Sequence, residues 1–184
     1  MTDSPRAALL NRCLAFVQEG GFGHLSLREI AAGAGTSHRM LIYHFGSREG
    51  LLAEIVGRIE AEQRLALADL AQQEGTLADI SRVFWQRLTD PSLAPAERLF
   101  FEIYVQALHG RSWTDGFRQS VIDAWEGPLI SLLAGHGVEP VHARKLARLA
   151  LATTRGLLLD LLMTGERELV DEVAELFSAL LTHP

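Results

Sequence analysis

Residues 25–52 read LSLREIAAGAGTSHRMLIYHFGSREGLL and contain two short segments in which apolar residues recur at helical spacing. The segments cover residues 27–34 and 38–45, and only the three residues GTS separate them. Three residues are too few for anything except a sharp turn between two helices. The spacing therefore predicts a helix-turn-helix.

Both helices of this unit have start signals. Ser26 stands three residues before Glu29, so the serine hydroxyl can accept a hydrogen bond from a free backbone N–H while the carboxylate reaches back. Ser37 can begin the second helix in the same way. The buried faces are then predicted to consist of Leu27, Ile30, Ala31, Ala34, Leu41 and Phe45.

The residues left outward on the second helix are His38, Arg39, Met40, Tyr43 and His44. They form a donor-rich surface with one large aromatic ring, on an element narrow enough to enter the major groove of DNA. The pattern therefore favours a nucleic-acid partner.

The whole stretch resembles the DNA-binding domain of the TetR (tetracycline-repressor-like) family of bacterial transcriptional regulators, which carries an I-A-x-x-A-G-x-S-x-x-x-L-Y-x-H-F-x-S-[KR]-x-x-L core. One position departs from the family pattern, because Ile42 stands where a phosphate-contacting tyrosine is usual, with Tyr43 following it. The positions that fall on the pattern are Ile30, Ala31, Ala34, Gly35, Ser37, Leu41, His44, Phe45, Ser47, Arg48 and Leu51.

The resemblance implies a dimeric regulator that a small molecule releases from its operator. On that basis we expect Arg39 to read a guanine, with His38 and Met40 touching neighbouring base edges. The expected phosphate contacts are Arg28, Thr36, Ser37, Tyr43, His44 and Arg48. For any single one of these residues, a solvated surface position is the alternative.

Charge is unevenly distributed along the 184 residues. The formal net charge is −6, yet residues 1–50 hold five arginines against four acids, whereas residues 51–184 hold twelve basic residues against nineteen acids. A near-neutral N-terminal segment can still bind phosphates through a few placed arginines. Hydrophobic residues make up 48% of the chain and charged residues 22%, which excludes a disordered protein.

Cys13 is the one cysteine, and it falls on the apolar face of the first helix, so a buried thiol is favoured over a redox sensor. The polar start Met-Thr-Asp-Ser-Pro has no signal-peptide character, and together with the lone cysteine this predicts a cytoplasmic protein. The most hydrophobic window, residues 146–163, contains Arg148, Arg155 and Asp160, so no membrane span is expected.

The rest of the chain predicts only helices, so the fold class is all-α, a three-helix N-terminal head joined by a long helix to a helical body. Residues 1–47 are interpreted as the helix-turn-helix DNA-binding domain and residues 48–184 as the ligand-binding and dimerisation domain. The expected helices cover about 5–19, 27–34, 38–45, 47–73, 76–89, 95–109, 114–135, 140–163 and 168–182.

The last two helices are unusually apolar. Residues 146–163 are apolar almost all round, and residues 169–181 carry an apolar stripe at helical spacing. A helix that is apolar on every side must be covered on every side. We expect a homodimer through the helices at about 140–163 and 168–182, with a fully internal helix as the alternative.

Eight of the thirteen aromatic residues fall between residues 84 and 125. Such a concentration can wall an apolar ligand cavity, although each residue alone is more often part of a core. The predicted ligand-binding residues are Trp85, Phe101, Tyr104, Trp113, Phe117, Trp125 and Arg155.

No enzymatic reading has support in the sequence. The histidines show no metal-ligand spacing, and neither a nucleophile elbow nor a phosphate-cradling glycine loop is present, so no catalytic residue, metal or cofactor is expected. The sequence predicts a ligand-responsive regulator, a repressor, that binds double-stranded palindromic DNA and a small, mostly apolar effector. The rival is a helical ligand-binding or interaction module without DNA binding.

Overall fold

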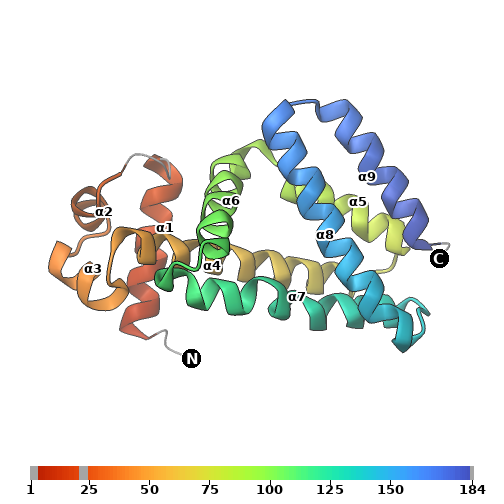
Figure 1. Cartoon of the computed structure of the whole chain (residues 1–184), viewed down its shortest axis with the longest axis horizontal. Helices are drawn as coiled ribbons and strands as arrows, with labels where there is room; N and C mark the ends of the chain where they lie inside the picture. Colours follow the sequence, from red (N-terminus) through yellow and green to blue (C-terminus); the bar gives the residue numbers. More distant parts are fainter. Residues whose placement is uncertain (1–3, 21–24, 183–184) are drawn as a thin grey trace. The chain divides into compact units, whose positions relative to one another are not determined.

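The computed structural model describes residues 4–20 and 25–182, and within them every regular element is a helix (Figure 1). The predicted all-α fold class is therefore confirmed. In the first part of the chain the helices are α1 (Pro5–Gly20), α2 (Leu27–Gly33), α3 (His38–Phe45) and α4 (Arg48–Leu70). The predicted helix-turn-helix is α2 and α3, and the predicted long helix is α4.

The second part contains five α-helices, two of which follow directly on a short 3-10 turn. In chain order the five α-helices and the two 3-10 helices are α5 (Leu77–Leu88), η1 (Pro91–Leu93), α6 (Ala94–Leu108), η2 (Ser112–Thr114), α7 (Asp115–Gly135), α8 (Pro140–Thr164) and α9 (Arg167–Thr182). Helix ends follow local signals. Thr76 and Asp79 form a capping box at the start of α5, and Gly165, with a φ of 72°, ends α8 in the left-handed conformation.

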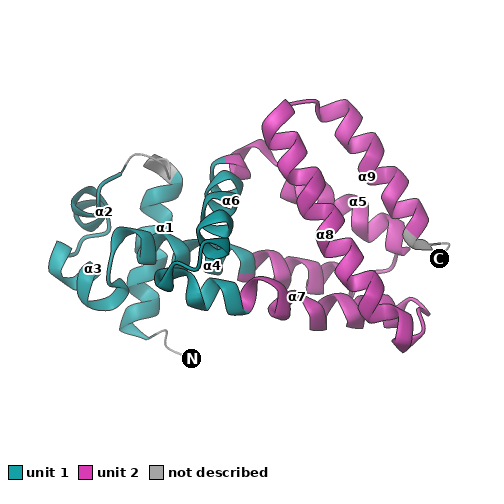
Figure 2. Ribbon diagram, viewed as in Figure 1, with its two compact units in different colours: residues 1–60, 95–119 teal, residues 61–94, 120–184 magenta. Residues whose placement is uncertain are grey.

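The chain packs as two compact units (Figure 2). Unit 1 comprises Met1–Glu60 and Pro95–Gln119, and unit 2 comprises Ala61–Ala94 and Ser120–Pro184. Unit 1 therefore contains α1, α2, α3, the first part of α4 and nearly all of α6. Division by packing is a different property from division by role, so the functional boundary after residue 47 stays a prediction.

The N-terminal helices of unit 1 share one small core. Val17 of α1, Ile30 of α2, Leu41 of α3 and Ile55 of α4 are all fully buried. Burial of one branched aliphatic side chain from each helix removes apolar surface from water, and this packing stabilises α2 and α3, which are too short to persist alone.

The junction between α3 and α4 depends on two glycines. Gly46 follows α3 with a φ of 75°, a conformation that residues with a Cβ rarely adopt. Gly50 lies in the first turn of α4, and a Cβ at this position would stand 2.3 Å from the Phe45 carbonyl oxygen. Because a backbone oxygen cannot move aside, this turn requires a glycine.

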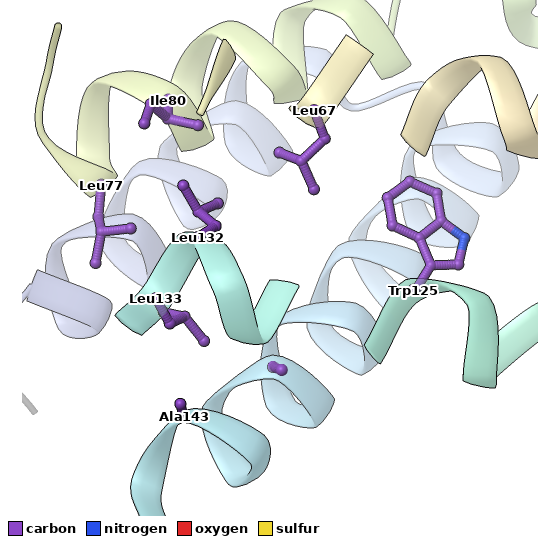
Figure 3. Close-up of a cluster of buried hydrophobic side chains, with 8 residues drawn as sticks. Leu67, Leu77, Ile80, Trp125, Leu132, Leu133 and Ala143 are labelled. Carbon is purple, nitrogen blue, oxygen red and sulfur yellow. The ribbon is translucent and has the colours of Figure 1, made fainter. Parts of the chain in front are cut away.

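The core of unit 2 is a cluster of buried apolar side chains from α4, α5, α7 and α8 (Figure 3). Helix α9 covers this unit by packing on α5 and α8. Two side-chain hydrogen bonds join α9 to α5, from Trp85 Nε1 to Asp171 Oδ1 at 2.7 Å and between the hydroxyls of Ser81 and Ser178 at 2.7 Å. The cluster consists of Leu67, Leu77, Ile80, Trp125, Leu132, Leu133, Ala143 and Ala147.

Candidate nucleic-acid interface

The turn between α2 and α3 is built as the sequence predicted. The Ser26 hydroxyl accepts from the Glu29 N–H at 3.3 Å, and Glu29 Oε2 accepts from the Ser26 N–H at 2.7 Å. Hydrogen bonds from the Ser26 hydroxyl and from the Ser26 N–H to the Glu29 carboxyl lower the pKa of that carboxyl. Ser37 caps α3 by accepting from the Met40 N–H at 3.2 Å, and Gly35, with a φ of 63°, makes the turn. Both predicted caps are confirmed.

Helix α3 buries only two of its eight residues, Leu41 and Phe45. On the other side, His38 and Arg39 are exposed, and so is the ring of Tyr43, at 79%. Met40 is exposed as well. A helix anchored by two side chains therefore turns a row of hydrogen-bond donors, one thioether and one phenol toward solvent.

The position that departs from the family pattern is also outward. Ile42 is 40% exposed, and the neighbouring Tyr43 ring meets the His44 ring edge to face at a centroid distance of 4.9 Å. Partial exposure of an isoleucine leaves an apolar spot beside the tyrosine. The Tyr43 hydroxyl is the only phenolic group that α3 offers, while His44 is half-buried.

The five arginines of residues 1–50 divide into two groups. Arg28 on α2 and Arg39 on α3 are exposed and make no hydrogen bond or ion pair with any other described residue. By contrast, Arg6, Arg12 and Arg48 each donate to a backbone carbonyl inside unit 1. Three of the five arginines of residues 1–50 therefore bind the protein itself.

Arg48 is the predicted phosphate contact with the most internal bonding. Its Nε donates to the Leu25 carbonyl oxygen at 2.7 Å, which ties the start of α4 to the segment before α2. The remaining polar residues predicted to touch phosphates lie at the α2–α3 turn, where Thr36 is half-buried and Ser37 is exposed.

Sequence reasoning missed Arg6 and Arg12. Arg12 Nε donates to the Ala34 carbonyl oxygen at 3.0 Å, and Arg6 Nε donates to the His44 carbonyl oxygen at 3.4 Å. Ala34 is 22 residues from Arg12 along the chain and His44 is 38 residues from Arg6, so no local sequence pattern predicts these contacts. The only available signal was that these two arginines are the basic residues of the first helix.

The residues predicted to bind a ligand are distributed over both units. Unit 1 holds Phe101, Tyr104, Trp113 and Phe117, and the Tyr104 and Phe117 rings meet at a centroid distance of 6.2 Å. Phe100, which was not among the predicted residues, contacts Phe101, Tyr104 and Phe117 at 5.1 to 5.7 Å. The structure therefore brings three of the four together as an aromatic cluster.

Unit 2 holds the other three predicted ligand residues in separate surroundings. Trp125 is buried in the hydrophobic cluster, 6.0 Å from the Phe84 ring. Arg155 donates from Nη2 to the Val121 carbonyl oxygen at 2.5 Å. Trp85 borders a cavity of about 440 Å³ between α5 and α9, whose other lining residues include Arg82, Gln86, Arg167, Asp171, Glu175 and Ser178.

Three further observations bear on the alternatives. Cys13 is completely buried, and burial raises the pKa of its thiol, which supports the reading as a core residue. Residues 4–20 and 25–182 include no helix that combines the length and the apolar character of a membrane span. The same residues bring no three histidine, cysteine or acidic side chains together as a metal site.

The fold and the N-terminal geometry define a helix-turn-helix protein with an all-α body. Residues 9–55 match the family model described as bacterial regulatory proteins, tetR family. The resemblance predicted from the sequence is thereby confirmed over residues 9–55, the segment that contains the helix-turn-helix.

Solved structures of such regulators share the fold over the whole chain. A putative transcriptional regulator from Rhodococcus sp. RHA1 is 22% identical, with a TM-score of 0.74 over 98% of this chain and 97% of that one. A putative TetR-family regulator from Rhodococcus sp. is 18% identical, with a TM-score of 0.71 over 96% and 97%. The regulator FadR from Bacillus subtilis, solved with stearoyl-CoA, is 15% identical, with a TM-score of 0.62 over 96% and 97%. A comparison with curated protein sequences gave no significant match.

Proposed function

We propose that this regulator binds double-stranded DNA by inserting α3 into the major groove. The observation that carries the proposal is the exposed surface of α3, where the donors of His38 and Arg39 and the Met40 thioether project from a helix fixed by Leu41 and Phe45. Arg39 reads a guanine, and Met40 meets a thymine methyl. Arg28, Thr36, Ser37, Tyr43, His44 and Arg48 contact phosphates.

A homodimer through α8 and α9 accompanies this activity. On α8, exposed residues without charge recur at intervals of three and four along Leu149, Ala152, Gly156, Leu159 and Met163. On α9, Leu169, Val173, Leu176 and Leu180 follow the same intervals, and all four are exposed. These two apolar stripes lie on helices that pack against each other. Exposed apolar patches of this kind are uncommon on monomeric proteins. A second copy of the chain, related by two-fold symmetry, would cover the stripes with its own.

Dimerisation gives the DNA-binding surface its target geometry. Two copies of α3 related by a two-fold axis read two half-sites about 34–36 Å apart, one helical turn of DNA, on a pseudo-palindrome. A protein bound there blocks transcription of the adjacent gene, so we propose a repressor role.

A small, mostly apolar effector would release the DNA. In unit 1 the aromatic cluster of Phe100, Phe101, Tyr104 and Phe117 offers ring faces, and Tyr104 adds a hydroxyl. The structural neighbour FadR, solved with stearoyl-CoA, supports a ligand with a large apolar part. The proposed contacts in unit 1 are Phe101, Tyr104, Trp113 and Phe117. Ligand binding by Trp85, Trp125 and Arg155 of unit 2 stays a prediction.

Footprinting of the purified full-length protein on the DNA that flanks its own gene tests the DNA-binding proposal. The expected result is protection of two related half-sites one helical turn apart, with affinity that falls as salt is raised. Uniform binding to operator and random DNA would contradict the proposal. A protein that binds ligands but protects no DNA would favour the rival interaction module.

Thermal unfolding and DNA binding measured together test the effector proposal. Acyl and aromatic compounds are added at saturating concentration, and an effector should raise the melting temperature and weaken operator binding in the same range. A screen in which no compound does both would count against a small apolar effector, while leaving the DNA-binding result unaffected.

A further inference from the structure

The two helices of the helix-turn-helix are short, so the last turn makes up about half of each helix. Helix α2 has seven residues and α3 has eight. The last four carbonyl groups of a helix lack partners within it and carry the negative end of the helix dipole. In α2 and α3 some of these carbonyls accept from backbone N–H groups just past the helix, as Ile30 does from Ala34 and Ile42 does from Gly46, whereas the carbonyls of Ala34 and His44 accept from another helix.

Two arginines of α1 supply such donors, one to each helix. Arg12 Nε donates to the carbonyl of Ala34, the C-cap of α2, at 3.0 Å, and this bond is half-buried. Arg6 Nε donates to the carbonyl of His44, in the last turn of α3, at 3.4 Å. Arginines placed at helix C-termini interact favourably with both the free carbonyls and the dipole.

Arg6 makes two more contacts that connect α3 with its neighbours. Its guanidinium lies over the Phe45 ring at 5.1 Å from the centroid, and Nη2 forms an ion pair with Glu54 of α4. One side chain of α1 therefore touches the last two residues of α3 and the second turn of α4. Charge-assisted hydrogen bonds and cation–π contacts both depend on direction, so they fix orientation as well as contact.

The spacing of the two arginines explains how one helix reaches both targets. Six residues on an α-helix correspond to a rotation of about 240°, so Arg6 and Arg12 leave α1 in directions that differ by about 120°. Arg12 points to the end of α2 while Arg6 points to the end of α3. Helix α1 therefore contacts both helices of the helix-turn-helix at their C-terminal ends.

We propose that Arg6 and Arg12 are positioning residues for DNA recognition, which fix the orientation of α3 without contacting DNA. The inference rests on the proposed function, since it assigns these residues a role in presenting the surface of α3. The inference also gives the arginines of residues 1–50 two different roles. Arg28 and Arg39 contact DNA, whereas Arg6 and Arg12 bind the protein.

The decisive measurement compares operator and random DNA over a range of salt concentrations, for wild type and Arg6→Met. Methionine keeps most of the side-chain length but removes the charge and the donors. Operator affinity should fall by about threefold to tenfold, while binding to random DNA and the slope of log K against log salt stay unchanged. Arg6→Lys, which keeps the charge, should recover part of the loss, and Arg12→Met should behave like Arg6→Met.

Arg82→Met is the matched control, because Arg82 is an exposed arginine in an ion pair with Asp79 in unit 2. It should leave operator affinity unchanged. Hydrogen exchange of the α3 amides in DNA-free protein adds a second readout, which should be faster in Arg6→Met and Arg12→Met only. A global loss of stability would instead speed exchange in unit 2 as well.

The outcomes separate the two proposals. Absence of operator binding by the wild type would overturn the proposed function. With wild-type binding intact, unchanged operator affinity in both methionine variants would overturn this inference alone. A loss shared equally by operator and random DNA, with a shallower salt slope, would identify these arginines as phosphate contacts and would also overturn it.

Discussion

The surface of α3 and the stripes of α8 and α9 are both left open by the folded chain, but their chemistry is opposite. On α3, Arg39 and Tyr43 turn charge and hydrogen-bonding groups outward. On α9, Leu176 and Leu180 turn bare hydrocarbon outward, each more than 60% exposed. A charged surface finds its partner through phosphates and base edges, whereas an apolar surface gains most from leaving water. The contrast is consistent with the two partners proposed above, DNA for the first surface and a second copy of the chain for the other.

The largest effect is expected on the apolar surface. Leu176→Glu should raise the dissociation constant of the dimer at least about a hundredfold, because two-fold symmetry places two carboxylates in one interface. Sedimentation equilibrium over a concentration series measures the change, and operator affinity should fall with it.

Leu65→Glu provides the control for this change. Leu65 of α4 is 62% exposed and Leu176 is 61% exposed, so the two substitutions place the same charge on equally accessible leucines. The Leu65 variant should keep the association state of the wild type. If both variants dissociate to the same extent, the apolar stripes are not the interface.

On the polar surface, Arg39→Ala should cost about 1–3 kcal/mol of operator binding and relax specificity at one base position, since a bidentate contact to guanine is lost. Selection from randomised half-sites measures the specificity. Arg98→Ala, which removes an exposed arginine of α6, should change neither quantity. Equal losses on operator and random DNA would move Arg39 from base reading to phosphate contact.

These two surfaces differ in how well sequence could predict them. The helix boundaries of α2 and α3 follow from signals within four residues, such as the Ser26–Glu29 box and the glycine of the turn. The outward face of α3 and the stripe on α9 follow from periodicity, whereas the sequence of α8 is apolar almost all round and does not show which of its sides is exposed.

Contacts between segments that are distant in the chain could not be predicted from the sequence. The Arg12 bond to the Ala34 carbonyl and the Arg48 bond to the Leu25 carbonyl depend on how the helices cross, and no spacing rule gives that. The predicted ligand residues show the same limit. Composition indicated the aromatic concentration, yet only the folded chain shows that Phe100 joins Tyr104 and Phe117 while Trp85 hydrogen-bonds to Asp171.

A smaller effect tests the backbone that supports α3. Gly50→Ala places a Cβ 2.3 Å from the Phe45 carbonyl oxygen, and relieving this overlap should cost about 1–3 kcal/mol of folding free energy. The higher helix propensity of alanine should offset up to about 1 kcal/mol of this cost. Chemical denaturation measures the difference. The control is Gly57→Ala in the same helix, where a Cβ meets nothing within 4 Å, so its stability should stay equal or rise. Similar losses in both variants would place the cost in α4 itself.

The smallest expected effect concerns capping, which occurs in both units. The pKa of Glu29 lies below the ordinary value of 4.5 because Ser26 donates to its carboxylate, and the pKa of Asp79 lies below 3.8 because Thr76 does the same at the start of α5. A lowered folded-state pKa contributes stability that is present above the unfolded-state value and is lost as the pH falls through the folded-state value. Both contributions should therefore be complete at pH 7 and disappear in acid.

Glu29→Gln and Asp79→Asn remove these contributions one at a time. Each variant should melt slightly below the wild type at pH 7, and the gap should close as the pH falls below about 4.5 for Glu29 and below about 3.8 for Asp79. Hydrogen exchange should place the first loss in α2 and the second in α5. The second loss should leave α3 unaffected, whereas the first should also loosen α3, because its turn follows directly on α2. A gap that stays constant from pH 7 to pH 3 would mean that the carboxylate charge does not stabilise the cap.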